Sequence, residues 1–157
     1  MALGDRNLVG RCGLYCGACI IYRAGKDSVE LQRRVAERQG CRPEQIKCGG
    51  CQTVSVSGWD VEGEEWGKRC KIIRCLDEKG FGFCYECGVY PNCERFREIA
   101  DSCFKAGEDL VKNLERIKAG KVEDWLREEG EKWKCGKCGK PITMRLAECH
   151  WCGAKLR

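Results

Sequence analysis

The sequence predicts an α+β fold in three parts: a cysteine-rich helical body, a helical neck and a small C-terminal ribbon. The chain has 16 cysteines among 157 residues, most of them in closely spaced pairs and triplets. The cysteines interrupt nearly every apolar run of the first hundred residues, whereas residues 110–133 carry apolar side chains at helical spacing. We expect the body over residues 1–105, the neck over 106–132 and the ribbon over 133–157.

The ribbon carries the most specific motif of the chain. Cys135-Gly-Lys-Cys138-Gly is followed, ten residues later, by Cys149-His-Trp-Cys152-Gly. A Cys-x-x-Cys turn aims both sulfurs to one side, and the following glycine lets the backbone fold back sharply. Two such turns place four thiolates around one tetrahedral ion, so we predict these four cysteines as the ligands of a zinc ribbon. His150 is expected to point outward and not to bind the ion.

The other cysteines also favour metal ligation. The N-terminus lacks the apolar core of a signal peptide, so we expect a protein of the reducing cytoplasm. Repeated Cys-x-x-Cys pairs there indicate bound metal, with disulfides and a thioredoxin-like dithiol as the less favoured alternatives. Because 34% of the residues are charged, we expect bound metal to supply folding free energy that a small core cannot.

The body begins with a glycine-rich loop over residues 10–19, wrapped around its own cysteines. A helix is expected next, capped by Asp27 with Glu30 three residues later, and ended by Gly40. Pro43 then opens a turn that leads to the next cysteine pair. The alternation over residues 53–56 predicts a short strand.

Residues 52–69 are expected to form a hairpin or an inserted loop. Trp59 and Trp66 flank four acidic residues within it. These tryptophans mark either a partner surface or, as we favour, a solvated loop whose aromatic side chains fold back.

Helices are expected over most of the remaining chain before the ribbon. Cys70 and Cys75 lie on a helical turn that leads to Lys79-Gly80, and a longer helical pattern begins at Glu94. In the neck, Gly120 separates two apolar stripes. These consist of Leu110, Leu114 and Ile117, then Val122, Trp125, Leu126 and Trp133.

The order of the cysteine motifs resembles a prokaryotic cysteine-rich family known as a domain of unknown function. The motifs are Cys12-Gly-Leu-x-Cys16-x-x-Cys19, Cys48-x-Gly-Cys51, Cys70-x-Ile-x-x-Cys75, Cys84-x-x-Cys87 and Tyr90-Pro-x-Cys93. The resemblance covers about residues 8–105, and some members carry a C-terminal ribbon. It implies metal binding, with zinc as the expected ion, and no assigned reaction.

These motifs give the body ten candidate ligands, whereas two four-coordinate sites need only eight. With the ribbon, the prediction is about three zinc ions per chain. The two remaining thiols are either buried small hydrophobic groups or an accessible pair with redox or nucleophilic chemistry. Cys41 and Cys103 lie outside the motifs, and we interpret both as structural.

Two further interpretations of the body remain open. Cys12, Cys16 and Cys19 have the spacing that holds the cluster of radical S-adenosylmethionine enzymes, but no succession of strands and helices long enough for their barrel follows. We therefore expect a binding or adaptor protein more than an enzyme. The alternative is a redox protein whose body cysteines hold an iron–sulfur cluster.

The positive charge lies in the ribbon. Residues 1–130 hold 22 Lys and Arg against 22 Asp and Glu, whereas residues 131–157 hold 7 against 2. Each ion held by four thiolates adds a net charge of about −2. A protein partner is the favoured prediction. The alternative is weak nucleic-acid binding by the ribbon, with Lys132, Lys134, Lys137, Lys140 and Arg145 contacting phosphates and with Trp133 and Trp151 stacking on bases.

Overall fold

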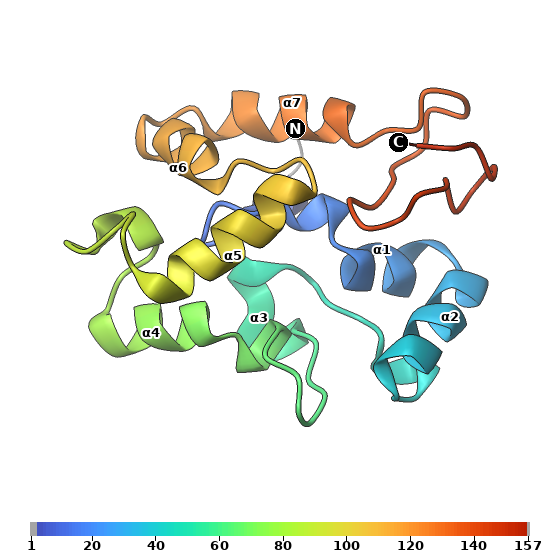
Figure 1. The fold of residues 1–157 in the computed structure, drawn as a ribbon, viewed down its shortest axis with the longest axis horizontal. Coiled ribbons are helices and arrows are strands. Elements are labelled where there is room, and N and C mark those ends of the chain that lie inside the picture. The colour runs from blue at the N-terminus through green and yellow to red at the C-terminus, as the bar shows by residue number, and fades with distance from the viewer. Residues whose placement is uncertain (1–2, 157) are drawn as a thin grey trace.

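Helices make up almost all the regular structure of the chain, which a computed structural model describes over residues 3–156 (Figure 1). The α-helices of this region are α1 Ile20–Asp27, α2 Val29–Gln39, α3 Val54–Ser57, α4 Lys71–Lys79, α5 Glu94–Lys105, α6 Leu110–Lys118 and α7 Val122–Lys132. The 3₁₀ turns are η1 Leu3–Leu8, η2 Cys16–Ala18, η3 Pro43–Gln45, η4 Cys51–Thr53, η5 Gly67–Arg69 and η6 Cys84–Glu86.

The predicted β component is wrong. Over residues 3–156 the structure contains no strand, only isolated bridges that pair Val9 with Tyr15, Lys134 with Pro141 and Glu148 with Lys155. The fold class is therefore mostly helical, and the small ribbon is built from turns.

The strand predicted over residues 53–56 is instead a 3₁₀ turn followed by α3. Hydroxyl groups stabilise this conformation, because Ser57 Oγ donates to the Thr53 carbonyl at 3.1 Å and contacts Thr53 Oγ1 at 2.8 Å. Val54 is buried and Val56 is 85% exposed, so the helical turn points in different directions two valines that a strand would place on one face. The apolar alternation was too short to distinguish these conformations.

The first predicted helix corresponds to α2 alone, and α1 lies before it in a segment where no helix was predicted. Helix α1 ends at Asp27, and Ser28 caps α2 by accepting a hydrogen bond from the Leu31 backbone N–H at 3.2 Å. The expected cap at Asp27 is thus wrong by one residue, because extended backbone at Ser28 leaves its hydroxyl facing the first turn of α2. The predicted end is confirmed, since Gly40 adopts a left-handed conformation with φ of 65°.

The later helices follow the sequence pattern. Helix α4 ends at Gly80 and the neck is divided at Gly120, and both glycines have a positive φ. In the loop between α3 and α4, Trp59 is buried, whereas Trp66 is 45% exposed. The expectation that both aromatic side chains fold back is correct for Trp59 only.

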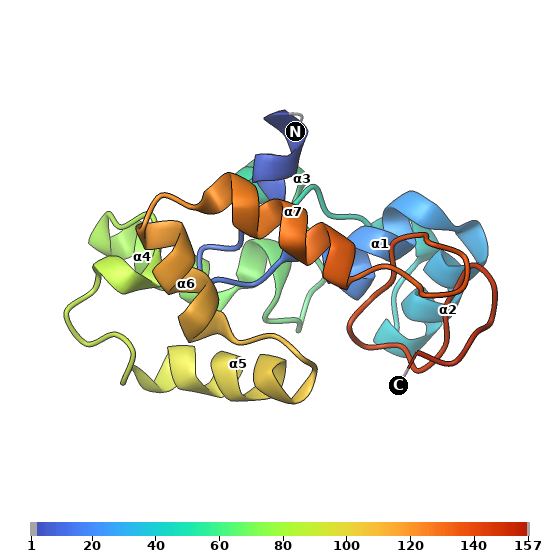
Figure 2. The same ribbon diagram turned by 90° about the horizontal axis from the view of Figure 1, so that it is seen from above.

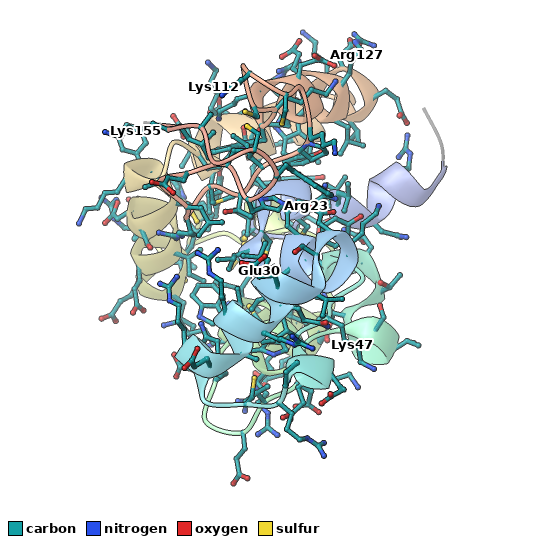
Figure 3. The ribbon with its side chains drawn as sticks, turned by 90° about the vertical axis from the view of Figure 1, so that its right-hand side faces the viewer. Arg23, Glu30, Lys47, Lys112, Arg127 and Lys155 are labelled. Atoms are coloured by element: carbon teal, nitrogen blue, oxygen red, sulfur yellow. The ribbon has the colours of Figure 1, made fainter. Side chains whose placement is uncertain are left out.

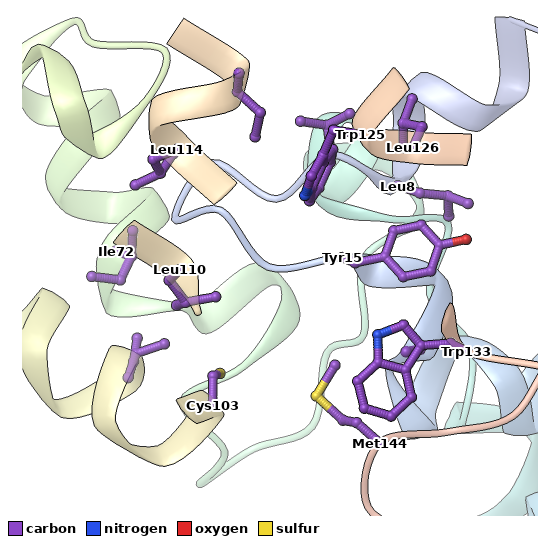
Figure 4. Close-up of a cluster of buried hydrophobic side chains, with 14 of the residues drawn as sticks. Leu8, Tyr15, Ile72, Cys103, Leu110, Leu114, Trp125, Leu126, Trp133 and Met144 are labelled. Carbon is purple, nitrogen blue, oxygen red and sulfur yellow. The ribbon is translucent and has the colours of Figure 1, made fainter. Parts of the chain in front are cut away.

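One large apolar cluster joins segments from the whole length of the chain. Figure 4 shows Trp125 of α7 and Leu114 of α6 with Tyr15 of the first loop and Met144 of the ribbon segment. Trp125 lies edge-on to the Tyr15 ring, with centroids 6.1 Å apart. A second cluster lies between α1, α2 and the loop at Trp59. The large cluster includes residues of the predicted body, neck and ribbon, so it does not separate them. Their division into three domains stays a prediction.

A buried carboxylate, Glu108, lies where these parts meet. It is 0% exposed and accepts hydrogen bonds from Asn113 Nδ2 at 2.8 Å, Lys132 Nζ at 2.9 Å and Trp133 Nε1 at 2.5 Å. Asn113 also donates to the Gly13 carbonyl at 2.9 Å. Burial raises the pKa of Glu108, but these donors and the Glu129 carboxyl outweigh burial and hold the pKa below its usual value.

Glu129 lies in the same site, and its pKa is shifted in the opposite direction. Its pKa is raised to about 8 by burial and by the neighbouring negative charge of Glu108. The ionised Glu108 and the protonated Glu129 therefore share a proton at neutral pH.

No helix in the described part of the chain is long and apolar enough to cross a membrane.

The raised pKa of Glu129 predicts a pH dependence of stability. In the unfolded chain this carboxyl ionises near its ordinary value of 4.5, whereas the folded chain keeps the proton up to about pH 8. Between these values the unfolded state binds fewer protons, so this group's contribution to the free energy of unfolding decreases as the pH rises. We expect Glu129→Gln, whose amide still donates to Glu108, to gain stability relative to the unsubstituted chain from pH 5 to pH 8.

Urea unfolding at several pH values measures this difference. Glu128→Gln is the matched control, because the neighbouring Glu128 is exposed and paired with Arg116. A difference between Glu129→Gln and the unsubstituted chain that does not change from pH 5 to pH 8 contradicts the assignment.

Candidate metal centre

The four ribbon cysteines converge on one point. The sulfurs of Cys135, Cys138, Cys149 and Cys152 all lie within 4.8 Å of one another. Two of the distances, from Cys135 to Cys152 and from Cys138 to Cys149, are 3.7 Å. A tetrahedron with Zn–S bonds of about 2.3 Å has edges of about 3.8 Å, so the sulfurs already have the spacing of a four-thiolate zinc site.

Two similar turns produce this arrangement. In the first, the Gly139 backbone N–H donates to the Cys135 carbonyl at 2.8 Å, and in the second Gly153 donates to Cys149 at 2.9 Å. Gly139 has φ of 73° and Gly153 has φ of 76°, a conformation that favours glycine. The glycine after each pair is thus required by the turn that presents the two sulfurs.

Backbone amides lie next to the sulfur of the first cysteine in each turn. The N–H groups of Lys137 and Trp151 lie 3.4 Å from the sulfurs of Cys135 and Cys149. Backbone N–H groups of Cys138 and Lys137 lower the pKa of Cys135 to about 6. This sulfur is therefore charged at neutral pH, which is the state that binds metal.

His150 does not point outward as predicted. Its side chain is 1% exposed, and Nε2 lies 3.0 Å from Oδ2 of Asp27 at the end of α1. Arg23 Nη1 lies 3.6 Å from the same carboxylate oxygen. The residue between the ribbon ligands is buried because the ribbon rests on α1, a long-range contact that the local motif does not encode.

The ribbon is also joined to the body through its backbone. The Met144 N–H donates to the Ala18 carbonyl at 3.0 Å. Figures 1 and 2 show the C-terminal segment lying over α1 and α2. In Figure 3, Arg23 lies between α1 and this segment, whereas Lys155, Lys112 and Arg127 lie at the periphery.

The structure divides the ten body cysteines between two cavities. The larger has a volume of about 550 Å³ and a mainly apolar lining. Six predicted ligands line it, namely Cys12, Cys16, Cys19, Cys48, Cys51 and Cys70. Cys103, which lies outside the motifs, lines it as well and is buried on α5.

The smaller cavity has a volume of about 30 Å³ and is lined by the other four cysteines, Cys75, Cys84, Cys87 and Cys93. Lys79 and Arg95 line it too. The sequence analysis did not predict these two cations. The one indication of them in the sequence is that Lys79 lies near Cys75 and Arg95 near Cys93.

The body sulfurs are less closely gathered than those of the ribbon. In the described residues, the ribbon cysteines are the one set of three or more Cys, His, Asp or Glu with ligand atoms all within 4.8 Å of one another. Burial, with the neighbouring Cys51 next in importance, raises the pKa of both Cys12 and Cys16. Such thiols are neutral at neutral pH unless a cation compensates them. Metal ligation by the body cysteines stays a prediction.

Comparison with known proteins gives a family match. A family model described as a protein of unknown function, DUF3795, matches residues 8–98, which is more than half of the chain. A search of curated proteins and a search of solved structures found no significant match. The matched region includes every body motif from Cys12 to Cys93 and ends before the ribbon.

Replacing one ribbon ligand should remove one metal ion per chain. Cys138→Ser leaves three sulfurs, which cannot close a tetrahedral shell, so we expect the zinc content measured by native mass spectrometry to fall by one. Cys41→Ser, which removes a thiol outside the motifs, is the control and should keep the full content. Unchanged zinc in Cys138→Ser is incompatible with the four-cysteine assignment.

The contact of Asp27 with His150 should anchor the ribbon to the body. Asp27→Ala leaves Arg23 buried without its carboxylate, so we expect a loss of about 3 kcal/mol in the free energy of unfolding. Amide exchange should increase at Met144 and at residues 149–151 while the zinc content stays constant. Glu30→Ala, an exposed change on α2, is the control. Unaltered exchange in the ribbon is the result that contradicts this anchoring.

Proposed function

Since the chain belongs to the DUF3795 family of proteins of unknown function, we propose a role from its own residues: a zinc-binding adaptor of the reducing cytoplasm that binds a protein partner. Bound ions hold loops and short helices in one arrangement, and the resulting surface recognises the partner. The observation that carries the proposal is the ribbon, whose sulfurs lie at the spacing of a four-thiolate zinc site.

The metal has a structural role in this proposal. The ribbon contains turns in place of regular elements, and its cysteines Cys135 and Cys149 belong to the large apolar cluster. Backbone hydrogen bonds such as Gly139 to Cys135 and Gly153 to Cys149 lie within each turn, so the ion supplies the cross-link between the two turns. The ion thereby also keeps Ile142 and Met144 in the core of the body.

Exposed apolar side chains support a protein partner. Large hydrophobic residues are normally buried, and those on the surface contribute most to binding when a partner covers them. The largest exposed ones are Trp66 at 45%, Phe104 at 67% and Trp151 at 36%. Trp151 lies on the ribbon with Lys140 Nζ 4.6 Å from its ring centroid, and tryptophan is among the residues enriched in protein interfaces.

A second candidate function is redox chemistry at an iron–sulfur cluster. The observation that favours it is the larger cavity, because six motif cysteines line it and one tetrahedral ion needs only four. Its volume of about 550 Å³ exceeds what one ion requires. An apolar lining would also keep water away from cluster sulfurs, which tunes their potential.

Nucleic-acid binding by the ribbon has weaker support. Trp133 is 1% exposed and Lys132 donates to Glu108, so neither is free to contact a nucleic acid. Lys134 Nζ lies 2.5 Å from Glu131 Oε1, so the positive charge of this third predicted phosphate contact is compensated within the protein. Three of the predicted cations remain, together with Trp151, and so few phosphate contacts give weak binding that moderate salt abolishes.

Metal analysis of anaerobically purified protein tests the two main candidates. For the zinc adaptor we expect a colourless protein with about three zinc ions per chain and no iron. For the cluster we expect visible absorbance from thiolate–iron charge transfer, with iron and acid-labile sulfide present. Cys138→Ser is the internal control, since it should remove one zinc in either case. A chain that retains no metal after purification in excess zinc contradicts both.

A further inference from the structure

We propose that Cys75, Cys84, Cys87 and Cys93 form a second four-thiolate zinc site, separate from the ribbon and from the larger cavity. This inference rests on the proposed function, because it assigns one of the zinc ions expected in the body. It also divides the ten body cysteines, since these four act together and the other six belong to a different site.

Three segments bring the four sulfurs together. Cys75 lies on α4, Cys84 and Cys87 begin and follow the η6 turn, and Cys93 caps the N-terminus of α5. The pair around η6 is a Cys-x-x-Cys turn closed by a hydrogen bond from the Cys87 N–H to the Cys84 carbonyl at 3.1 Å. Two ligands from a turn and one from each of two helices is a suitable arrangement for a tetrahedral ion.

The size of the cavity favours a single ion. Its volume of about 30 Å³ equals the space of about one water molecule, so one ion fits and an iron–sulfur cluster does not. The sulfurs must move inward to reach zinc, because they are not all within 4.8 Å of one another as the ribbon sulfurs are. Ile72, Leu76 and Phe96 complete the wall of the cavity on its buried side.

The charges around the cavity match a four-thiolate ion site. Four thiolates and one divalent ion carry a net charge of about −2, and two cations, Lys79 and Arg95, line the cavity. Lys79 Nζ lies 3.4 Å from the Cys87 sulfur. The N-terminus of α5, a helix of 12 residues, adds its partial positive charge at Cys93. Neutral thiols would not need this compensation.

Zinc counting in matched variants tests the site. Cys75→Ser and Cys93→Ser should each bind one zinc fewer than the unsubstituted chain by native mass spectrometry. Cys75→Ser combined with Cys138→Ser should bind two fewer, because the two sites are separate. Cys41→Ser should bind the full number. Unchanged zinc in both Cys75→Ser and Cys93→Ser overturns the proposal.

The same measurements separate this inference from the proposed function. If the unsubstituted chain binds one zinc and loses it in Cys138→Ser, the body binds no zinc, so this inference fails while the ribbon still supports the proposed function. If the unsubstituted chain binds no zinc at all, both fail. A further outcome is that the body binds a zinc that is lost in Cys51→Ser and kept in Cys75→Ser. The proposed function is then still supported, and the assignment of these four cysteines fails.

Two measurements do not depend on the folding of a cysteine variant. In the unsubstituted chain, mass spectrometry after alkylation should find the four cysteines protected together and modified together once a chelator removes one zinc. Lys79→Gln should accelerate transfer of that zinc to the chelator about 10-fold, as expected for loss of a group that bonds to a metal ligand. Lys71→Gln, on the same helix and paired with Glu98, is the control. Free alkylation of the four cysteines in the zinc-loaded protein, or disulfides between them, overturns the proposal.

Discussion

The buried carboxylate of Glu108 is the interaction on which the rest of the arrangement depends. It has no exposed surface, and an ionised group in that position is stable only when donors surround it. Those donors come from α6, from the end of α7 and from the residue that begins the ribbon segment, Trp133. Asn113 extends the network to the Gly13 carbonyl, in the loop of the first cysteines. One charge thus fixes the helical neck against both cysteine-bearing ends of the chain.

The ribbon is held from two sides, and this makes its metal site part of the fold. Trp133 joins it to Glu108, and His150 joins it to Asp27 on α1. Between these points, Ile142 and Met144 lie in the large apolar cluster. A ribbon that only followed the neck would leave its four-cysteine group without influence on the body. Here Ile142 and Met144, which fill the core, lie between the two cysteine pairs in the same segment, so order in the group requires order in the core.

The sequence allowed correct prediction where the information is local. The convergence of the four ribbon cysteines followed from two identical spacings, and the helix ends at Gly40, Gly80 and Gly120 followed from a residue that tolerates positive φ. Prediction failed where two conformations have the same local pattern. Four alternating residues at 53–56 suit a strand and one turn of helix equally, and the hydroxyl bonds of Ser57 favour the helix. The cap at Ser28 was missed because Asp27, one residue earlier, is as good a capping residue.

By itself the sequence determined the cysteine-based chemistry of this protein: four ribbon thiols with the spacing of one tetrahedral ion, and a series of body motifs within the region that matches the family model. The tertiary structure decided which body cysteines lie together, because Cys75 and Cys93 are on different helices and only the packing of α4 against α5 brings them to one cavity. It likewise decided that His150 and Glu108 are buried. Their partners, Asp27 and Lys132, are distant in the sequence, and no spacing rule connects residues that meet only when separate helices pack together.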